Sequence, residues 1–221
     1  MPKTEPFDNH SNQYDNWFIE NKYAFESELK AIKKVIPDNG KGIEIGIGSG
    51  IFAEQLNINE GIEPSKAMRE KAKMKNINVV DAVAENLPYP DKSKDFALMV
   101  TTICFVDDIY KSLKEVNRIL KNNGFLIIGF VDKNSPVGKF YLKNKEKSIF
   151  YKDAVFYATE ELYKILKNTG FKIENTYQTV FLKLNEINNV QEVLTGYGQG
   201  SFVVLKAKKI INYDKQSSKT Y

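Results

Sequence analysis

The stretch that decides the fold is KGIEIGIGSG, residues 41–50. Its first half is a short apolar run of strand length, and its second half places Gly46, Gly48 and Gly50 at every second position. Glycines at a strand-to-helix turn let the backbone approach a ligand closely and aim free N–H groups at it. The stretch therefore predicts the first strand, a ligand-binding turn and the first helix of an α/β domain.

Apolar runs of strand length alternate with amphipathic stretches after this turn, which favours a parallel sheet covered by helices. Strands are predicted at 41–47, 60–63, 77–82, 95–100 and 124–131, with helices at 51–56, 64–75 and 107–123. In the last of these helices, apolar residues recur at helical spacing and are predicted to be core: Ile109, Leu113, Val116, Ile119 and Leu120. Asp107 or Asp108 is expected to cap its start, and Gly124 lies just past its predicted end.

The alternation of strand and helix patterns is interrupted after the fifth predicted strand. Residues 132–158 are polar, rich in lysine and dotted with aromatic residues, and are interpreted as an insertion or lid. A helix capped by Thr159 and closed by Gly170 follows, and strands at 171–181 and 201–209 are expected to pair antiparallel at one edge. The fold class is thus α/β: a doubly wound, mostly parallel, Rossmann-like sheet of about seven strands with an antiparallel edge hairpin.

The chain of 221 residues suits one domain. We expect it to span residues 1–209, with a leader and cap helix in 1–40, where Trp17 to Ile36 has helical spacing and should cover the ligand edge of the sheet. Residues 210–221 are expected to form a disordered tail. The sequence contains neither a signal peptide nor an apolar run of about 20 residues, which predicts a soluble, cytoplasmic protein without membrane contact.

Charge and cysteine content narrow the function classes. The net charge is +4, but the basic residues are nearly all lysine, with Arg69 and Arg118 as the arginines. Specific nucleic-acid recognition relies on bidentate arginine, so a small molecule is favoured as partner over nucleic acid or protein. The single cysteine, Cys104, excludes an internal disulfide and a thiolate metal cluster, and no metal is expected.

Two phosphate-binding interpretations of the glycine turn fit poorly. A dinucleotide fingerprint requires glycine or alanine where Ile51 stands, and a P-loop requires Gly-Lys-Ser/Thr. The turn instead resembles motif I of the class I S-adenosylmethionine-dependent methyltransferases, an acidic residue followed by G-x-G-x-G, which Glu44, Gly46, Gly48 and Gly50 match. The resemblance implies that Glu44 orients the turn and contacts the amino-acid end of the cofactor, and that the glycines make room for it.

Two further segments agree with this resemblance. About 20 residues after the turn, the second strand ends at Glu63, the place where an acid accepts hydrogen bonds from both ribose hydroxyls. The segment DAVAENLPYPDKSKDFALMV, residues 81–100, resembles the family's motif after strand three, with Ala84 and Glu85 aligned and Val83 where many members have an acid. In the family this loop packs on the adenine. The stretches TTICFVDD (101–108) and KNKEKS (143–148) resemble an uncharacterised bacterial branch, and Thr101 joins the cofactor-binding candidates.

The resemblance implies transfer of a methyl group from S-adenosylmethionine to an unidentified, small organic acceptor. Tyr14 is expected to bind the cofactor, because an aromatic face near the sulfonium stabilises its charge. Tyr141 and Tyr151 from the insertion, and Tyr197 from the GYGQG loop, are candidates for binding the acceptor. Since methyl transfer chiefly requires alignment of donor and acceptor, no catalytic side chain is assigned. Two alternatives remain open: a module that binds S-adenosylmethionine or S-adenosylhomocysteine without turnover, and a NAD-dependent oxidoreductase.

Overall fold

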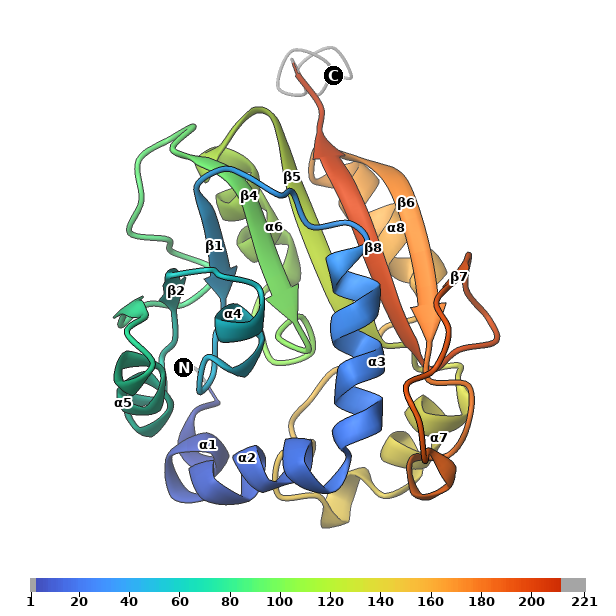
Figure 1. The fold of residues 1–221 in the computed structure, drawn as a ribbon. Coiled ribbons are helices and arrows are strands. Elements are labelled where there is room, and N and C mark those ends of the chain that lie inside the picture. Colours follow the sequence, from blue (N-terminus) through green and yellow to red (C-terminus); the bar gives the residue numbers. More distant parts are fainter. Residues whose placement is uncertain (1–2, 212–221) are drawn as a thin grey trace.

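The computed structural model describes residues 3–211, which form an eight-stranded sheet with helices on both faces (Figure 1). The strands are β1 (Gly42–Ile45), β2 (Glu60–Ile62), β3 (Asn78–Val80), β4 (Lys94–Val100), β5 (Leu120–Val131), β6 (Phe171–Thr179), β7 (Leu194–Thr195) and β8 (Phe202–Lys209). The α-helices are α1 (Glu5–Asn9), α2 (Ser11–Glu20), α3 (Lys22–Lys33), α4 (Ile51–Gln55), α5 (Lys66–Met74), α6 (Ile109–Ile119), α7 (Pro136–Lys143) and α8 (Thr159–Asn168). Single 3₁₀ turns occupy Lys145–Lys147 and Leu184–Glu186.

The order of strands in the sheet is β3-β2-β1-β4-β5-β8-β6-β7. Strands β1 to β5 are mutually parallel, and the order reverses direction between β1 and β4. In open α/β sheets, ligands bind outside the carboxyl ends of the strands at such a switch point. The predicted glycine turn follows β1 and therefore lies at this position.

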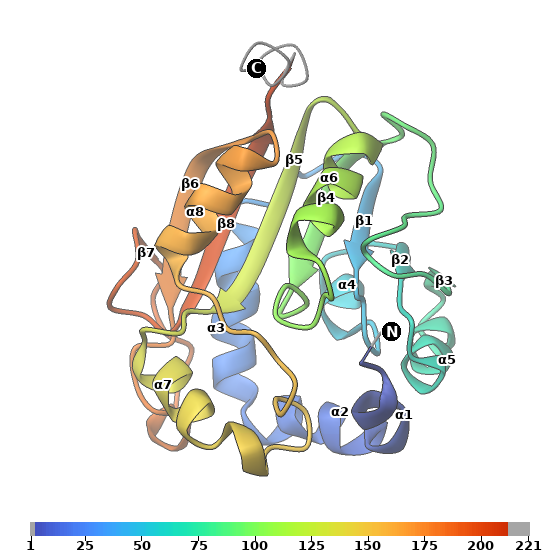
Figure 2. The same cartoon turned by 180° about the vertical axis from the view of Figure 1, so that it is seen from behind.

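The central strands bury both of their faces. In β4, Ala97 and Met99 belong to an apolar cluster with α6 and α8, whereas Leu98 and Val100 belong to a second cluster with α3 and α4. Figures 1 and 2 show these two pairs of helices on opposite faces of the sheet. Successive side chains of a strand point to opposite faces, so this alternation produces the continuous apolar runs seen in the sequence. All five core residues predicted for residues 109–120 are buried in the first cluster.

The predicted fold class is confirmed, with a different strand count and a different place for the last strand. β8 pairs antiparallel with both β5 and β6, so it lies inside the sheet, and the short β7 adds an edge strand beyond β6. The reason is burial: β8 presents Val203 and Leu205 to one cluster and Phe202 and Val204 to the other. A strand that is apolar on both faces requires a central position.

Two predicted helix ends were wrong. α6 ends at Ile119 because Leu120 is extended and already pairs in β5, so Gly124 lies within the strand and closes no helix. Asp108 caps the start of α6 as predicted: the backbone N–H of Lys111 donates to its Oδ1 at 3.0 Å. The N-cap of α8 is Ala158, whose N–H donates to Glu161 Oε2 at 2.8 Å, and Thr159 is the first helical residue.

The segment predicted as one helix from Trp17 to Ile36 is divided at Asn21. The side-chain amide of Asn21 donates to the carbonyl of Trp17 at 3.0 Å, which satisfies the end of α2 and lets α3 start in a new direction. α1, α2 and α7 lie beyond the carboxyl ends of the parallel strands, whereas α3 packs on a sheet face (Figure 1). Residues 212–221, in the predicted tail, lie outside the described residues. No helix within residues 3–211 is long and apolar enough to cross a membrane.

Candidate functional site

The turn after β1 is built from three glycines in the left-handed region of backbone space. Gly46, Gly48 and Gly50 have φ angles of +66°, +58° and +79°, a conformation that costs residues with a Cβ roughly 1–2 kcal/mol. At Gly46 a Cβ would also stand 2.4 Å from Cγ2 of Thr102. The φ angles disfavour residues with a Cβ at all three positions, and neighbouring side chains also leave no room for a Cβ at Gly46 and Gly50.

Glu63 follows β2 and joins the glycine turn to the start of α5. Its Oε2 accepts a hydrogen bond from the N–H of Gly48 and its Oε1 accepts one from the N–H of Ser65, each at 2.9 Å. The residue is 8% exposed, and this burial raises the pKa of its carboxyl to about 7. Two N–H donors thus fix the orientation of a carboxylate whose remaining lone pairs are free for a ligand.

A first cavity of about 490 Å³ opens at the switch point, beside β1 and β4. Seven of the residues predicted to bind a cofactor line it: Tyr14, Gly46, Gly48, Glu63, Ala84, Glu85 and Thr101. They come from α2, the turn after β1, the end of β2, the loop after β3 and the end of β4. Segments far apart in the sequence are thus brought to one cavity of a size suited to a small organic ligand.

Glu44 and Gly50 do not line this cavity. Gly50 packs under the turn, where a Cβ would stand 2.7 Å from Cδ1 of Ile77. Glu44 is 2% exposed, and its Oε2 has no hydrogen-bond partner within the described residues. Burial raises the pKa of Glu44 well above its usual range, and the backbone N–H of Ala53 opposes this shift.

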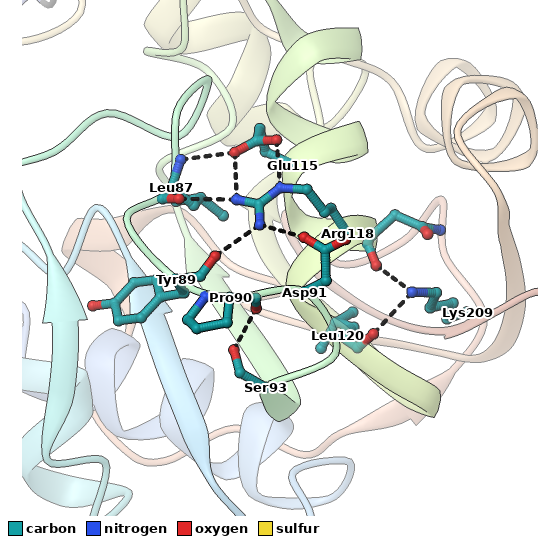
Figure 3. Close-up of polar contacts among 10 residues, drawn as sticks. Leu87, Tyr89, Pro90, Asp91, Ser93, Glu115, Arg118, Leu120 and Lys209 are labelled. Atoms are coloured by element: carbon teal, nitrogen blue, oxygen red, sulfur yellow. Dashed lines mark hydrogen bonds and ion pairs between the residues drawn. The ribbon is translucent and has the colours of Figure 1, made fainter.

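The loop after β3 is held by α6 (Figure 3). Arg118 donates from its guanidinium to the carbonyl oxygens of Leu87 and Tyr89 and to the carboxylates of Asp91 and Glu115, at distances of 2.7–2.9 Å. Glu115 Oε2 in turn accepts from the N–H of Leu87 at 2.9 Å. No sequence pattern indicated this role, because Arg118 lies 27 to 31 residues beyond the loop residues that it contacts.

Glu85 has a structural role in the same loop. Its Oε1 accepts hydrogen bonds from the N–H groups of Asp107 and Asp108 at 2.8 and 3.1 Å, just before α6 begins. These two bonds connect the loop after β3 to the loop after β4. Both loops line the first cavity, so Glu85 fixes the distance between two of its walls.

The leader is docked over the first cavity by polar contacts that no sequence pattern indicated. Asp8 Oδ1 accepts from Ser65 Oγ at 2.7 Å and from the N–H of Ala67 at 3.1 Å. Asp15 accepts from Ser49 Oγ at 2.6 Å and pairs with Lys71 at 2.7 Å. The leader is therefore tied to the glycine turn and to α5, and it brings Phe7 and Tyr14 to the cavity.

A second cavity of about 560 Å³ adjoins the first, and the two share Phe7, Tyr14, Thr101 and Phe105 as lining residues. Tyr141 and Tyr151, predicted to bind an acceptor, line the second cavity and stack with their ring centroids 4.8 Å apart. Tyr197 lies outside both cavities and packs edge-on against Tyr163. Thr101 has a φ of +52°, and such strain in a β-branched residue is typical of functional sites.

The glycine turn gives a first testable prediction. Gly48→Ala is expected to lower the free energy of unfolding by about 1–2 kcal/mol because of its positive φ. It should also weaken ligand binding in the first cavity severalfold, because the new Cβ stands 3.3 Å from the Tyr14 hydroxyl. Chemical denaturation and titration calorimetry with S-adenosylhomocysteine measure the two effects.

Gly198→Ala is the matched control for this prediction. Gly198 also has a positive φ, +95°, but a Cβ there meets nothing within 4 Å, and the residue lines neither cavity. It should lose stability without losing affinity. Equal affinities of the two variants for the ligand would contradict the role given to the turn.

The fold and the site together define a class: an α/β protein with a ligand-sized cavity at the switch point of a parallel sheet. Residues 43–128 match the model of a methyltransferase domain. The structure is similar to an S-adenosylmethionine-dependent methyltransferase of Thermotoga maritima, described as a possible histamine N-methyltransferase. The TM-score is 0.91 and the identity 48%, over 93% of this chain and 99% of that one.

Two relatives extend the comparison. An uncharacterised protein of Methanocaldococcus jannaschii is 42% identical over 204 residues, which cover 92% of this chain and 98% of the relative. A ubiquinone/menaquinone biosynthesis C-methyltransferase of Campylobacter jejuni is 34% identical over 134 residues, 56% of each chain. The chain belongs to the class I S-adenosylmethionine-dependent methyltransferase family, and S-adenosylmethionine is its cofactor. This membership removes the NAD-dependent oxidoreductase from the alternatives.

Proposed function

We propose that this protein transfers the methyl group of S-adenosylmethionine to a small organic acceptor that binds in the second cavity. The observation that carries the proposal is the shared wall: Phe7, Tyr14, Thr101 and Phe105 line both cavities. A donor in the first cavity and an acceptor in the second would meet at these residues. Holding two reactants in such an arrangement can supply roughly 7–11 kcal/mol toward reaction.

The residues of the first cavity fit the cofactor. Glu63 offers a fixed carboxylate for the ribose hydroxyls, and the loop bearing Ala84 offers an apolar surface for the adenine. Glu44 does not line the first cavity, so no contact with the cofactor is assigned to its buried carboxyl. When bound, the sulfonium supplies an activated methyl group. The protein itself therefore needs to position the donor and the acceptor and to exclude water from them. The aromatic ring of Tyr14 would face that charge.

The acceptor is proposed to be small because the second cavity, at about 560 Å³, is of the size that holds a compact organic molecule. Its aromatic lining, with Tyr141 and Tyr151 from the insertion, favours an acceptor with an apolar body. The name of the Thermotoga maritima relative includes histamine, a small amine with an aromatic ring, which agrees with this size.

The experiment combines binding with turnover. Purified protein is titrated with S-adenosylhomocysteine and then incubated with methyl-labelled S-adenosylmethionine and a metabolite extract. We expect binding and a labelled product that passes a small-molecule filter. Binding without any labelled product would favour the non-catalytic binding module. Label retained on protein or nucleic acid would refute the small acceptor.

A further inference from the structure

Glu28 is a buried carboxyl group in α3 that no described residue satisfies. It is 6% exposed, and no hydrogen bond or ion pair within residues 3–211 reaches its carboxyl oxygens. Burial raises its pKa to about 8. A carboxyl group without partners in such a place costs stability, so its presence requires a reason.

The sequence places Glu28 on the buried face of α3. Ala24, Glu28, Ala31 and Ile32 are spaced at i, i+4, i+7 and i+8, and all four are buried. This spacing places them on one face of the helix, directed toward the interior. An acidic residue on the buried face of an amphipathic helix is therefore a candidate functional residue that the sequence alone can indicate.

Glu28 lines the second cavity, where its surroundings are aromatic. The same cavity is lined by Tyr14, Trp17, Tyr141 and Tyr151. Removal from bulk water raises the pKa values of the three tyrosines, so their phenols stay neutral, and each also feels the charge of Glu28. The other ionisable residues that line the cavity, Glu20 and Lys147, are exposed. Glu28 is thus the buried group in the cavity that can carry charge.

A cation beside Glu28 would favour its ionised form, and the resulting carboxylate among aromatic rings would attract that cation. The faces of aromatic rings carry partial negative charge and stabilise an ammonium group, and a buried carboxylate gains a charged hydrogen bond from it. An anionic ligand would meet repulsion from both, and a neutral ligand would leave Glu28 without a strong partner. The cavity therefore selects for a positively charged nitrogen attached to an apolar body.

We propose that Glu28 binds the ammonium group of an alkylamine with an apolar body in the second cavity. The inference rests on the proposed function, because it assigns the acceptor class for that same cavity. Glu28 pairs with the nitrogen, while the aromatic rings of Trp17, Tyr141 and Tyr151 pack around the apolar body of the amine. Glu28 acts as a binding residue that selects the acceptor through its charge.

The test compares two probes of equal size that differ in charge, 2-phenylethylamine and 2-phenylethanol. Each is titrated by calorimetry into the protein saturated with S-adenosylhomocysteine. The wild-type protein is expected to bind the amine at least about tenfold more tightly than the alcohol, as one charged hydrogen bond provides. In Glu28→Gln the two affinities are expected to lie within about threefold of each other, since the neutral amide cannot pair with the cation.

Glu26→Gln is the matched control, because Glu26 lies on the same helix, pairs with Lys22 and lines neither cavity. It should keep the full preference for the amine. A wild-type protein that binds the alcohol as tightly as the amine, or binds neither probe, overturns the proposal without any variant. So does a folded Glu28→Gln that keeps the preference.

The binding of S-adenosylhomocysteine separates this test from the proposed function. Glu28 does not line the first cavity, so Glu28→Gln should bind S-adenosylhomocysteine like the wild-type protein. If the wild-type protein does not bind S-adenosylhomocysteine, the cofactor site itself is refuted. Normal binding together with a missing amine preference would refute the role of Glu28 alone.

Discussion

Replacing Glu63 by glutamine is expected to weaken the binding of S-adenosylhomocysteine by about 100-fold. The carboxylate accepts from the N–H groups of Gly48 and Ser65, one on each oxygen. An amide has a single oxygen, so its NH₂ group must face one of these two donors. The variant therefore loses hydrogen bonds to the ribose of the cofactor and also disturbs the glycine turn. Titration calorimetry measures the loss.

The pH dependence of this binding gives a second readout for the same residue. Burial raises the pKa of Glu63 to about 7, and the ribose hydroxyls donate to the ionised carboxylate. Affinity should therefore fall as the pH is lowered from 8 to 6, and Glu63→Gln should show a flat profile. The effect on folding has the opposite sign: a raised pKa in the folded state stabilises it at low pH, and this contribution is lost as the pH rises through 7.

Glu70→Gln is a suitable control, because Glu70 is an exposed acid on α5 that pairs with Lys73 and lines neither cavity. It should bind S-adenosylhomocysteine as the wild-type protein does, at every pH. An affinity of Glu63→Gln within about threefold of the wild-type value would contradict the role of Glu63 in holding the ribose.

The order of strands illustrates what the sequence could predict and what it could not. Apolar runs and turns were sufficient to predict the parallel strands, because each element is a local pattern of about ten residues. The position of β8 depended on comparing two strands: β6 has polar Glu174 and Asn175 in its middle, whereas β8 is buried from Phe202 to Leu205. That contrast indicates which strand is internal, but a hairpin pattern alone does not.

The candidate site likewise has one part that the sequence could predict and one part that it could not. The glycine turn and Glu63 follow strand ends, so their meeting at one edge could be expected from the parallel order alone. The docking of the leader through Asp8 and Asp15 could not, since Ser65 and Lys71, which they contact, lie more than 50 residues away. Acidic residues of a leader carry no sequence pattern that identifies such partners, and only the assembled structure reveals them.

Arg118→Ala is expected to lower the free energy of unfolding by about 3 kcal/mol. The guanidinium lies between α6 and the loop after β3, where it satisfies the carbonyl oxygens of Leu87 and Tyr89 (Figure 3). The side chain is 31% exposed, so water replaces part of the lost hydrogen bonding. The expected loss in the free energy of unfolding is therefore well below the summed energies of the hydrogen bonds. Denaturant titration measures the change.

Arg118→Lys distinguishes the contribution of the positive charge to stability from that of the planar guanidinium group. The planar fork of arginine donates along several directions at once, whereas an ammonium group is a single point from which donors cannot reach two carbonyls and two carboxylates together. The lysine variant should therefore recover less than half of the lost stability. Because Ala84 and Glu85 precede the held segment and line the first cavity, both variants should also bind S-adenosylhomocysteine severalfold more weakly. A lysine variant as stable as the wild-type protein would show that charge alone, and not the fork, holds the loop.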